Sequence, residues 1–104
     1  MPKVKEKEST IQKAVLDWLK YNNLLAVRLN NIDAHVDYPF LGVPISVWIE
    51  FKTSTGKLSE HQKNFKDKVE SYGGFYCIVR SIDDMESSLD DVKKEVESRI
   101  KNLQ

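Results

Sequence analysis

The sequence predicts a single α/β domain with the element order α-β-β-β-α-β-α, and three observations support this. The chain has 104 residues, enough for one compact domain with a modest core. Residues 6–22 and 59–72 repeat apolar side chains at helical spacing, and short runs rich in β-branched and aromatic residues lie between and after them. We therefore expect one domain over 1–104, with a core at about 8–80 and a C-terminal helix at about 82–102.

The composition is typical of a globular protein. Hydrophobic residues make up 40% and charged residues 31%, which argues against disorder. No apolar run approaches the ~20 residues of a membrane span, and the charged N-terminus has no apolar signal-peptide region. The sequence thus predicts a cytoplasmic protein with no membrane contact. The single cysteine, Cys77, excludes an internal disulfide and a cysteine zinc site.

The charge is zero overall but unevenly distributed. Residues 1–80 carry 12 Lys or Arg and 9 Asp or Glu, whereas residues 81–104 carry 4 and 7. A zero net charge argues mildly against nucleic acid as a partner. Carboxylates that bind a divalent cation would, however, leave the first part of the chain more positive towards a phosphate backbone.

The first predicted helix places one carboxylate beside its apolar face. Glu8 lies three residues before Ile11 and seven before Val15, so it projects from the core-facing side of the first turn. A lone acid there is costly unless it is paired, hydrogen-bonded or bound to metal. An acid at a helix N-terminus is also favourable in itself, so both interpretations of Glu8 stay open.

The next segment carries two candidate contact residues. Residues 24–29 form an apolar run that predicts a strand and is interrupted only by Arg28, which would pair with a core acid or contact phosphate. A polar connection follows at residues 30–35. His35 at its end is a candidate substrate contact, although a loop histidine without nearby ligands is more often simply exposed.

Residues 47–53 predict a strand with chemistry on one face. Side chains alternate along a strand, so Trp48, Glu50 and Lys52 share one face. A carboxylate and an ammonium group two residues apart can converge on one point. Glu-x-Lys by itself is common, however, and also fits a strand with a solvated polar face.

A hairpin would bring a second acid to this strand. Residues 37–41 predict a short strand, and a turn centred between Val43 and Pro44 would place Asp37 directly opposite Glu50. Opposed side chains have Cβ atoms roughly 4.5–5.5 Å apart, and two opposed acids repel unless a cation lies between them. The pattern therefore predicts a shared divalent cation.

The second half of the chain is predicted from its capping residues and apolar stripes. Ser59-x-x-Gln62 fits a capping box, which explains Gln62 structurally, although this side chain can also point inward. Residues 75–79 predict a buried strand. The last helix has an apolar stripe that either packs on the sheet or mates with another chain. The stripe consists of Met85, Leu89, Val92, Val96, Ile100 and Leu103.

Taken together, these motifs resemble the VRR-NUC domain of the PD-(D/E)XK nuclease superfamily. They are similar to those of archaeal-type Holliday junction resolvases and small free-standing phage members as well. The motifs are Glu8, Asp37, Glu50-Phe51-Lys52 and Lys57-Leu58-Ser59-x-x-Gln62. The resemblance implies a restriction-endonuclease-like core, in which helices flank a mixed central sheet.

The chain departs from the family pattern at the first aspartate. The family usually has Gly-x-Pro-Asp there, whereas this chain has Ala34-His35-Val36-Asp37. Asp33 is the competing position for that acid.

The resemblance implies metal-dependent hydrolysis of phosphodiester bonds that leaves 5′-phosphates. Asp37, Glu50 and the Phe51 carbonyl would hold Mg²⁺ or Mn²⁺, which prefer oxygen ligands, with Glu8 as a further ligand. A lysine beside the site would stabilise developing charge. The implied catalytic residues are Glu8, Asp37, Glu50, Lys52 and Gln62.

The implied partner is DNA, and the implied assembly is a homodimer acting on a branched or four-way junction, because two sites can cut symmetric strands. Arg28, His35 and Lys57 are the candidate substrate contacts. Nicking and flap cleavage are alternatives within the enzyme class. A catalytically inactive nuclease fold that binds DNA or protein is another. A third alternative is a small α/β interaction protein whose charges all lie on the surface. In that case Glu8, Asp37, Glu50 and Lys52 would not converge in space.

Overall fold

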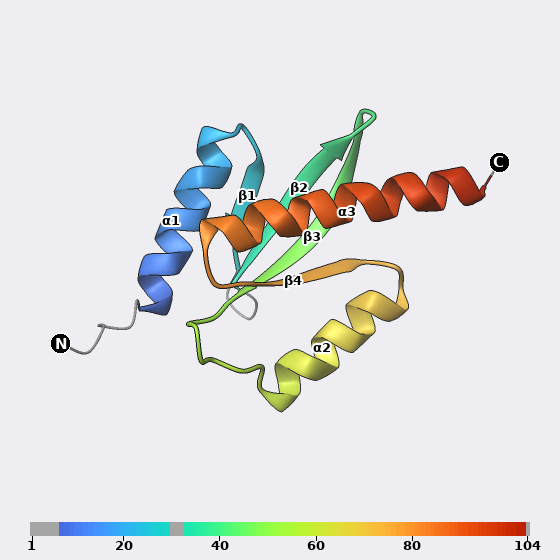
Figure 1. Ribbon diagram of the computed structural model, residues 1–104. Coiled ribbons are helices and arrows are strands. Elements are labelled where there is room, and N and C mark those ends of the chain that lie inside the picture. Colours follow the sequence, from blue (N-terminus) through green and yellow to red (C-terminus); the bar gives the residue numbers. More distant parts are fainter. Residues whose placement is uncertain (1–6, 30–32, 104) are drawn as a thin grey trace.

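The computed structural model describes residues 7–29 and 33–103 and confirms the predicted α/β class and element order (Figure 1). The elements are α1 (Glu8–Tyr21), β1 (Leu25–Arg28), β2 (Ala34–Phe40), β3 (Val43–Phe51), α2 (Glu60–Ser71), β4 (Phe75–Val79) and α3 (Ile82–Asn102). The predicted helix start at residue 6 and positions 30–32 of the predicted loop lie outside the described residues. Among the described residues, no helix combines the length and apolarity needed to cross a membrane.

The four strands form one mixed sheet in the order β1-β2-β3-β4. β1, β2 and β3 are antiparallel neighbours, whereas β3 and β4 run parallel. A parallel pair needs a crossover connection, and α2 supplies it. The sheet therefore has two edge strands, β1 and β4.

One face of the sheet forms the core with α1 and α3. Side chains of β2 and β3 that alternate along the strands point to this face and are fully buried, because α1 and α3 pack over them. The core residues are Ile11, Val15, Leu19, Ala34, Val36, Val47, Ile49, Phe51, Val79, Met85, Leu89 and Val92.

The opposite face is covered by α2 over β3 and β4. Phe65 of α2 packs edge-on against Trp48, with ring centroids 5.6 Å apart, and lies 6.1 Å from the ring of Tyr76. No residue of α2 is fully buried. On this face Leu25 and Val27 of β1 remain 66% and 48% exposed.

The β2–β3 hairpin differs from its prediction. It turns at Leu41 and Gly42, whose φ angles are 52° and 78°, so that Phe40 pairs with Val43. Two consecutive positive φ angles are typical of the two-residue turn that suits the twist of a hairpin. The predicted centre between residues 43 and 44 is therefore wrong, and β2 begins three residues earlier than predicted.

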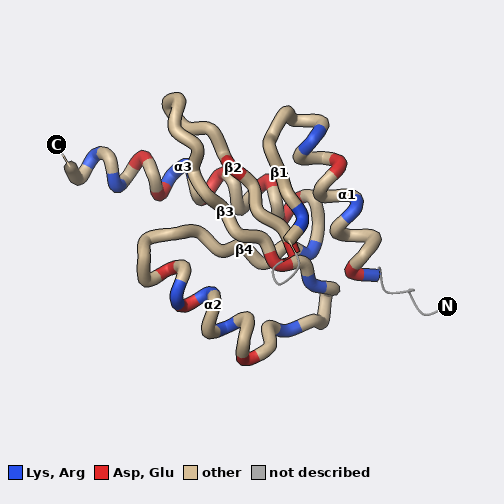
Figure 2. The backbone as a smooth tube through the Cα atoms, turned by 180° about the vertical axis from the view of Figure 1, so that it is seen from behind, with Lys and Arg blue, Asp and Glu red and all other residues tan. Residues whose placement is uncertain are grey.

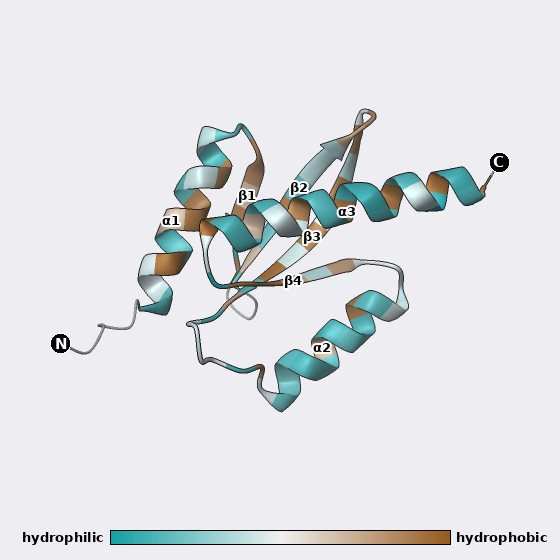
Figure 3. Cartoon of the chain, in the orientation of Figure 1, coloured by the Kyte–Doolittle hydropathy of each residue, from teal (hydrophilic) through white to brown (hydrophobic). Residues whose placement is uncertain are grey.

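The apolar stripe of α3 divides into two parts. Met85, Leu89 and Val92 are buried against the sheet, whereas Ile100 and Leu103 are 37% and 85% exposed. Figure 1 shows α3 running on past the sheet towards the C-terminus, and Figure 3 shows brown positions recurring along this end. Of the two predicted alternatives for the stripe, packing on the sheet is confirmed for its first half.

Candidate active site

The hairpin register brings Asp33, and not Asp37, to Glu50. Ala34 is paired with Ile49, so one step further along the ladder Asp33 faces Glu50. This is a position where the two residues do not exchange backbone hydrogen bonds, and the side chains of such pairs lie closest together. Asp37 is instead paired with Ser46, which makes the predicted contact between Asp37 and Glu50 wrong.

Among the described residues, Glu50 is the one charged residue that is buried, with 2% of its surface exposed. The Tyr76 hydroxyl group donates a hydrogen bond to Glu50 Oε1 at 3.3 Å. The pKa of Glu50 is raised to about 8, first by burial and then by the hydrogen bond and the charge of the Asp33 carboxyl group. Two carboxyl groups in contact at a buried position favour a shared proton or a bound cation.

Asp33 is held by the backbone of β3. The Phe51 N–H group donates to Asp33 Oδ2 at 2.6 Å, so the carboxylate lies against the backbone at the end of β3. In a strand, the N–H and C=O groups of one residue point towards the same neighbouring strand. The Phe51 carbonyl therefore points to the side on which the Asp33 carboxylate lies.

Lys52 adds a positive charge to this pair and is positioned by the loop that follows it. The charge of Lys52 lowers the pKa of Glu50, against the larger effects of burial and Asp33. A Cβ atom at Gly56 would lie 3.3 Å from Lys52 Cδ, so the glycine leaves room for the lysine stem. Arg80 donates to the carbonyls of Thr53 and Gly56, the latter at 2.9 Å, and so ties this loop to the end of β4.

His35, Asp37 and Ser46 form a separate cluster on the same face. His35 Nε2 shares a hydrogen bond with Ser46 Oγ and lies 3.8 Å from Asp37 Oδ1. The His35 ring also packs against Trp48, with centroids 4.6 Å apart. Both polar partners meet the same nitrogen, so the cluster lacks the relay geometry of a catalytic triad, in which the acid and the nucleophile meet opposite nitrogens.

The remaining predicted residues lie outside the carboxylate pair. Glu8 is exposed at the first residue of α1, which agrees with the second of its two interpretations, an acid at a helix N-terminus. Gln62 accepts a hydrogen bond from the Ser59 N–H group at 2.8 Å, which completes the predicted capping box. Lys57 is exposed in the loop before α2. Arg28 is exposed and lines a surface pocket with residues of α1.

Two contributors to the site, Tyr76 and Arg80, were not predicted. The alternation of β4 puts Tyr76 and Ile78 on one face, but only the parallel pairing of Trp48 with Tyr76 shows that this face is the one carrying Glu50. Arg80 directly follows β4, and no sequence motif indicated that its side chain would anchor the loop after β3. Within residues 7–29 and 33–103, no three His, Cys, Asp or Glu side chains gather as a metal cluster.

Comparison of the chain with models of known protein families, with curated proteins and with solved structures finds no match. The candidate site therefore depends on its own geometry: a buried carboxylate pair from two strands, a backbone carbonyl on the same side, and a lysine two residues beyond the buried acid.

Proposed function

We propose that this chain is a divalent-metal-dependent endonuclease that hydrolyses phosphodiester bonds of DNA. The observation that supports the proposal most directly is the meeting of Asp33 and Glu50 beside Phe51, with Lys52 directly after the same strand. This arrangement also agrees with the resemblance of the Glu50-Phe51-Lys52 motif to PD-(D/E)XK nucleases, with Asp33 in place of Asp37 as the first acid.

The donor set fits a hard divalent cation. Asp33 and Glu50 supply two carboxylates and Phe51 a carbonyl oxygen, which are the ligand types that Mg²⁺ and Mn²⁺ prefer. Glu50 is otherwise a buried acid whose ionised form is disfavoured. Mg²⁺ or Mn²⁺ held by these residues would supply charge neutralisation at the phosphate and a more acidic bound water.

The surrounding residues orient this donor set. The Tyr76 hydroxyl group holds one oxygen of Glu50, and the Phe51 N–H group holds one oxygen of Asp33, so neither carboxylate rotates freely. The Lys52 ammonium group would stabilise negative charge on the scissile phosphate, which is electrostatic stabilisation by a prepositioned cation. Arg80 would act as a positioning residue, because it fixes the loop against which Lys52 packs.

The family resemblance supports a branched or four-way DNA junction as the substrate. A homodimer would present two sites to two symmetric strands. The exposed Ile100 and Leu103 at the end of α3 would supply apolar surface for such a dimer. Nicking of duplex DNA and flap cleavage remain alternatives for the same catalytic centre.

The test is cleavage of an end-labelled four-way junction in Mg²⁺ or Mn²⁺, with linear duplex and 5′-flap substrates in parallel. We expect metal-dependent nicks with 5′-phosphate ends, together with Mn²⁺ binding measured by calorimetry on the protein alone. Mn²⁺ binding should be lost in Asp33→Asn and retained in Asp37→Asn.

The two readouts separate the competing functions. Tight junction binding without cleavage or Mn²⁺ binding would replace the enzyme with an inactive nuclease fold that binds DNA. Absence of both DNA binding and Mn²⁺ binding would favour the small α/β interaction protein.

A further inference from the structure

The edge of the sheet formed by β4 lies in a groove that is separate from the carboxylate pair. The groove has a volume of about 600 Å³, with β4 as its floor and α2 and α3 as its walls. Figure 1 shows β4 running between these two helices. Strand edges carry unpaired backbone groups and are ready templates for an added strand.

Hydrogen bonds on either side of β4 identify the backbone groups that face the groove. The Val79 carbonyl accepts from Lys52 N–H, so residues 75, 77 and 79 direct their backbone groups towards β3. The N–H groups of Gly74 and Arg80, which point the other way, are bound by Val69 and Asp84 respectively. The backbone groups of Tyr76 and Ile78 thus face the groove, and no strand within residues 7–29 and 33–103 pairs with them.

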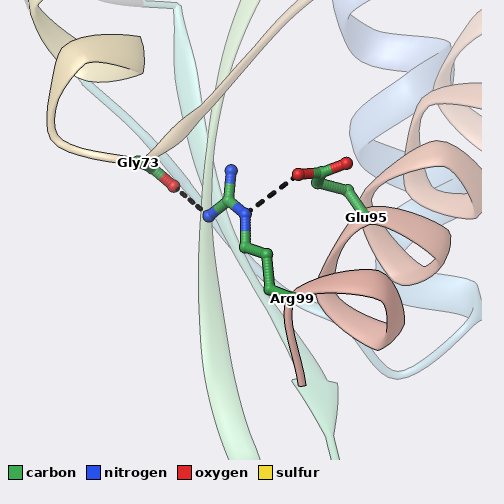
Figure 4. Close-up of polar contacts among 3 residues, drawn as sticks. All are labelled: Gly73, Glu95 and Arg99. Atoms are coloured by element: carbon green, nitrogen blue, oxygen red, sulfur yellow. Dashed lines mark hydrogen bonds and ion pairs between the residues drawn. The ribbon is translucent and has the colours of Figure 1, made fainter. Parts of the chain in front are cut away.

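Arg99 holds one end of the groove in place. Its guanidinium group donates to the Gly73 carbonyl at 2.6 Å and to Glu95 Oε1 at 3.0 Å (Figure 4). The same group lies 4.9 Å from the centroid of the Phe75 ring. These contacts join α3 to the turn between α2 and β4, so the width of the groove is set by a direct link between its walls.

The walls carry a negative balance of charge. Their charged residues are three acids and one arginine, namely Glu70, Asp91, Glu95 and Arg99. Glu70 is paired with Lys66 at 2.6 Å and Glu95 with Arg99 at 3.0 Å, so among the described residues Asp91 is the acid of the lining without an ion pair. Figure 2 shows acidic positions along α3 with basic positions between them towards the C-terminus, so the negative balance belongs to the groove lining and not to the whole helix. A DNA phosphate backbone would be repelled here. Two copies of the chain pairing through this edge would bring six carboxylates together, which disfavours a dimer at this site.

We propose that the β4 groove binds an extended, lysine- or arginine-rich peptide segment of a partner protein by strand addition. The backbone of the peptide would pair with Tyr76 and Ile78, and a basic side chain would lie against Asp91. This is the recognition mode in which main-chain hydrogen bonds supply affinity and side-chain surroundings supply specificity. The site and its partner are independent of the nuclease proposal.

The test is an NMR titration of the full chain with acetyl-Lys-Val-Lys-Val-Lys-Val-amide at low salt. We expect the Tyr76 and Ile78 amides to shift and to exchange more slowly with solvent, while the Cys77 and Val79 amides, already directed at β3, change little. Asp91→Lys should weaken binding about tenfold, because it replaces an attraction by a repulsion. Asp90→Lys, at the neighbouring position outside the groove lining, is the matched control and should weaken it less than about twofold.

Changes to the peptide test the proposal without altering the protein. A peptide with N-methyl groups on alternate residues cannot complete the ladder and should lose binding, as should Glu-Val-Glu-Val-Glu-Val. Equal binding of the methylated peptide would overturn the proposal, as would amide shifts centred on the other edge strand, β1, instead of β4. Concentration-dependent dimerisation that protects Tyr76 and Ile78 would assign the edge to a second copy and refute the peptide site.

Discussion

The two faces of the sheet differ in what covers them and in what they carry. On one face, Val36, Val47, Ile49 and Phe51 are fully buried beneath α1 and α3. On the other, α2 covers β3 and β4 without a single fully buried residue of its own, and the side chains include His35 and the buried Glu50. Adjacent residues of β3 thus belong to opposite environments.

The difference shows how a domain of this size can hold a costly charged site. The apolar face supplies burial, which is the main favourable contribution to folding. That stability allows the second face to keep two acids in contact, an arrangement disfavoured in itself. Substitutions on the first face should therefore change stability, and substitutions at Asp33 and Glu50 should change chemistry.

The largest effect is expected at Asp33. Under the proposed function, Asp33→Asn should lower the cleavage rate by about a hundredfold to a thousandfold, the range seen when one strong electrostatic contributor is removed from an active site. Asp37→Asn, a matched change two positions beyond His35 on the same face, should lie within about threefold of the wild-type rate. The measurement is single-turnover cleavage of the labelled junction at saturating protein.

The ratio of the two rates tests the register directly. If Asp37→Asn loses activity and Asp33→Asn keeps it, Asp37 is the metal-binding carboxylate, and the contact between Asp33 and Glu50 has no role in catalysis. Circular dichroism of both variants checks that the fold is retained.

A second comparison addresses the apolar face. Ile49→Ala should lower the free energy of unfolding by about 3 kcal/mol, because it removes three buried carbons and leaves a cavity in a fully buried position. Ser46→Ala, on the other face of the same strand, should change it by about 0.5 kcal/mol or less. Urea unfolding at constant pH measures both. Equal losses would show that the two faces contribute alike.

The order of elements could be predicted because it depends on local patterns. Ile11, Val15 and Leu19 repeat at helical spacing, and the Ser59 and Gln62 capping box marks the start of α2 without reference to the rest of the chain. The prediction that Glu50 and Lys52 lie on the same face also needs only the alternation of side chains along a strand.

The register could not be predicted, because it depends on the turn. Leu41 adopts a positive φ that favours glycine or asparagine, so the stretch Gly42-Val43-Pro44 gave the stronger turn signal. Pro39 and Pro44 are paired in the sheet, and neither has a backbone N–H group to donate to a ladder, so their sequence does not mark a regular strand. The predicted turn placed Asp37 opposite Glu50. The observed turn shifts the pairing by four residues along β2, so Asp33 lies there instead.

The pH dependence of stability tests the burial of Glu50. Its pKa is raised in the folded protein from 4.5 to about 8, so the folded state binds the proton more tightly than the unfolded state does. The free energy of unfolding should therefore fall as pH rises from about 4.5 to about 8, by up to about 1.4 kcal/mol per pH unit in the absence of divalent metal. Urea unfolding from pH 5 to pH 8 measures this slope.

Glu50→Gln supplies the control for that slope, because the amide is similar in size and does not titrate. The difference between the slopes of wild type and Glu50→Gln isolates the contribution of the Glu50 carboxyl group. A wild-type slope equal to that of the variant would contradict the raised pKa of Glu50.

The smallest effect is expected at Gln62 of α2. Its side-chain oxygen accepts from Ser59 N–H, and its own N–H group donates to Ser59 Oγ at 3.2 Å. Gln62→Ala should lower the free energy of unfolding by about 0.5–1 kcal/mol through loss of half the capping box. Gln62→Glu should keep the cap, since glutamate fills the same position in such boxes. Under the proposed function, cleavage should stay within about twofold in both variants. A fall in cleavage by Gln62→Glu at unchanged stability would instead make Gln62 a participant in catalysis, and α2 would then contribute to the chemistry of the face it covers.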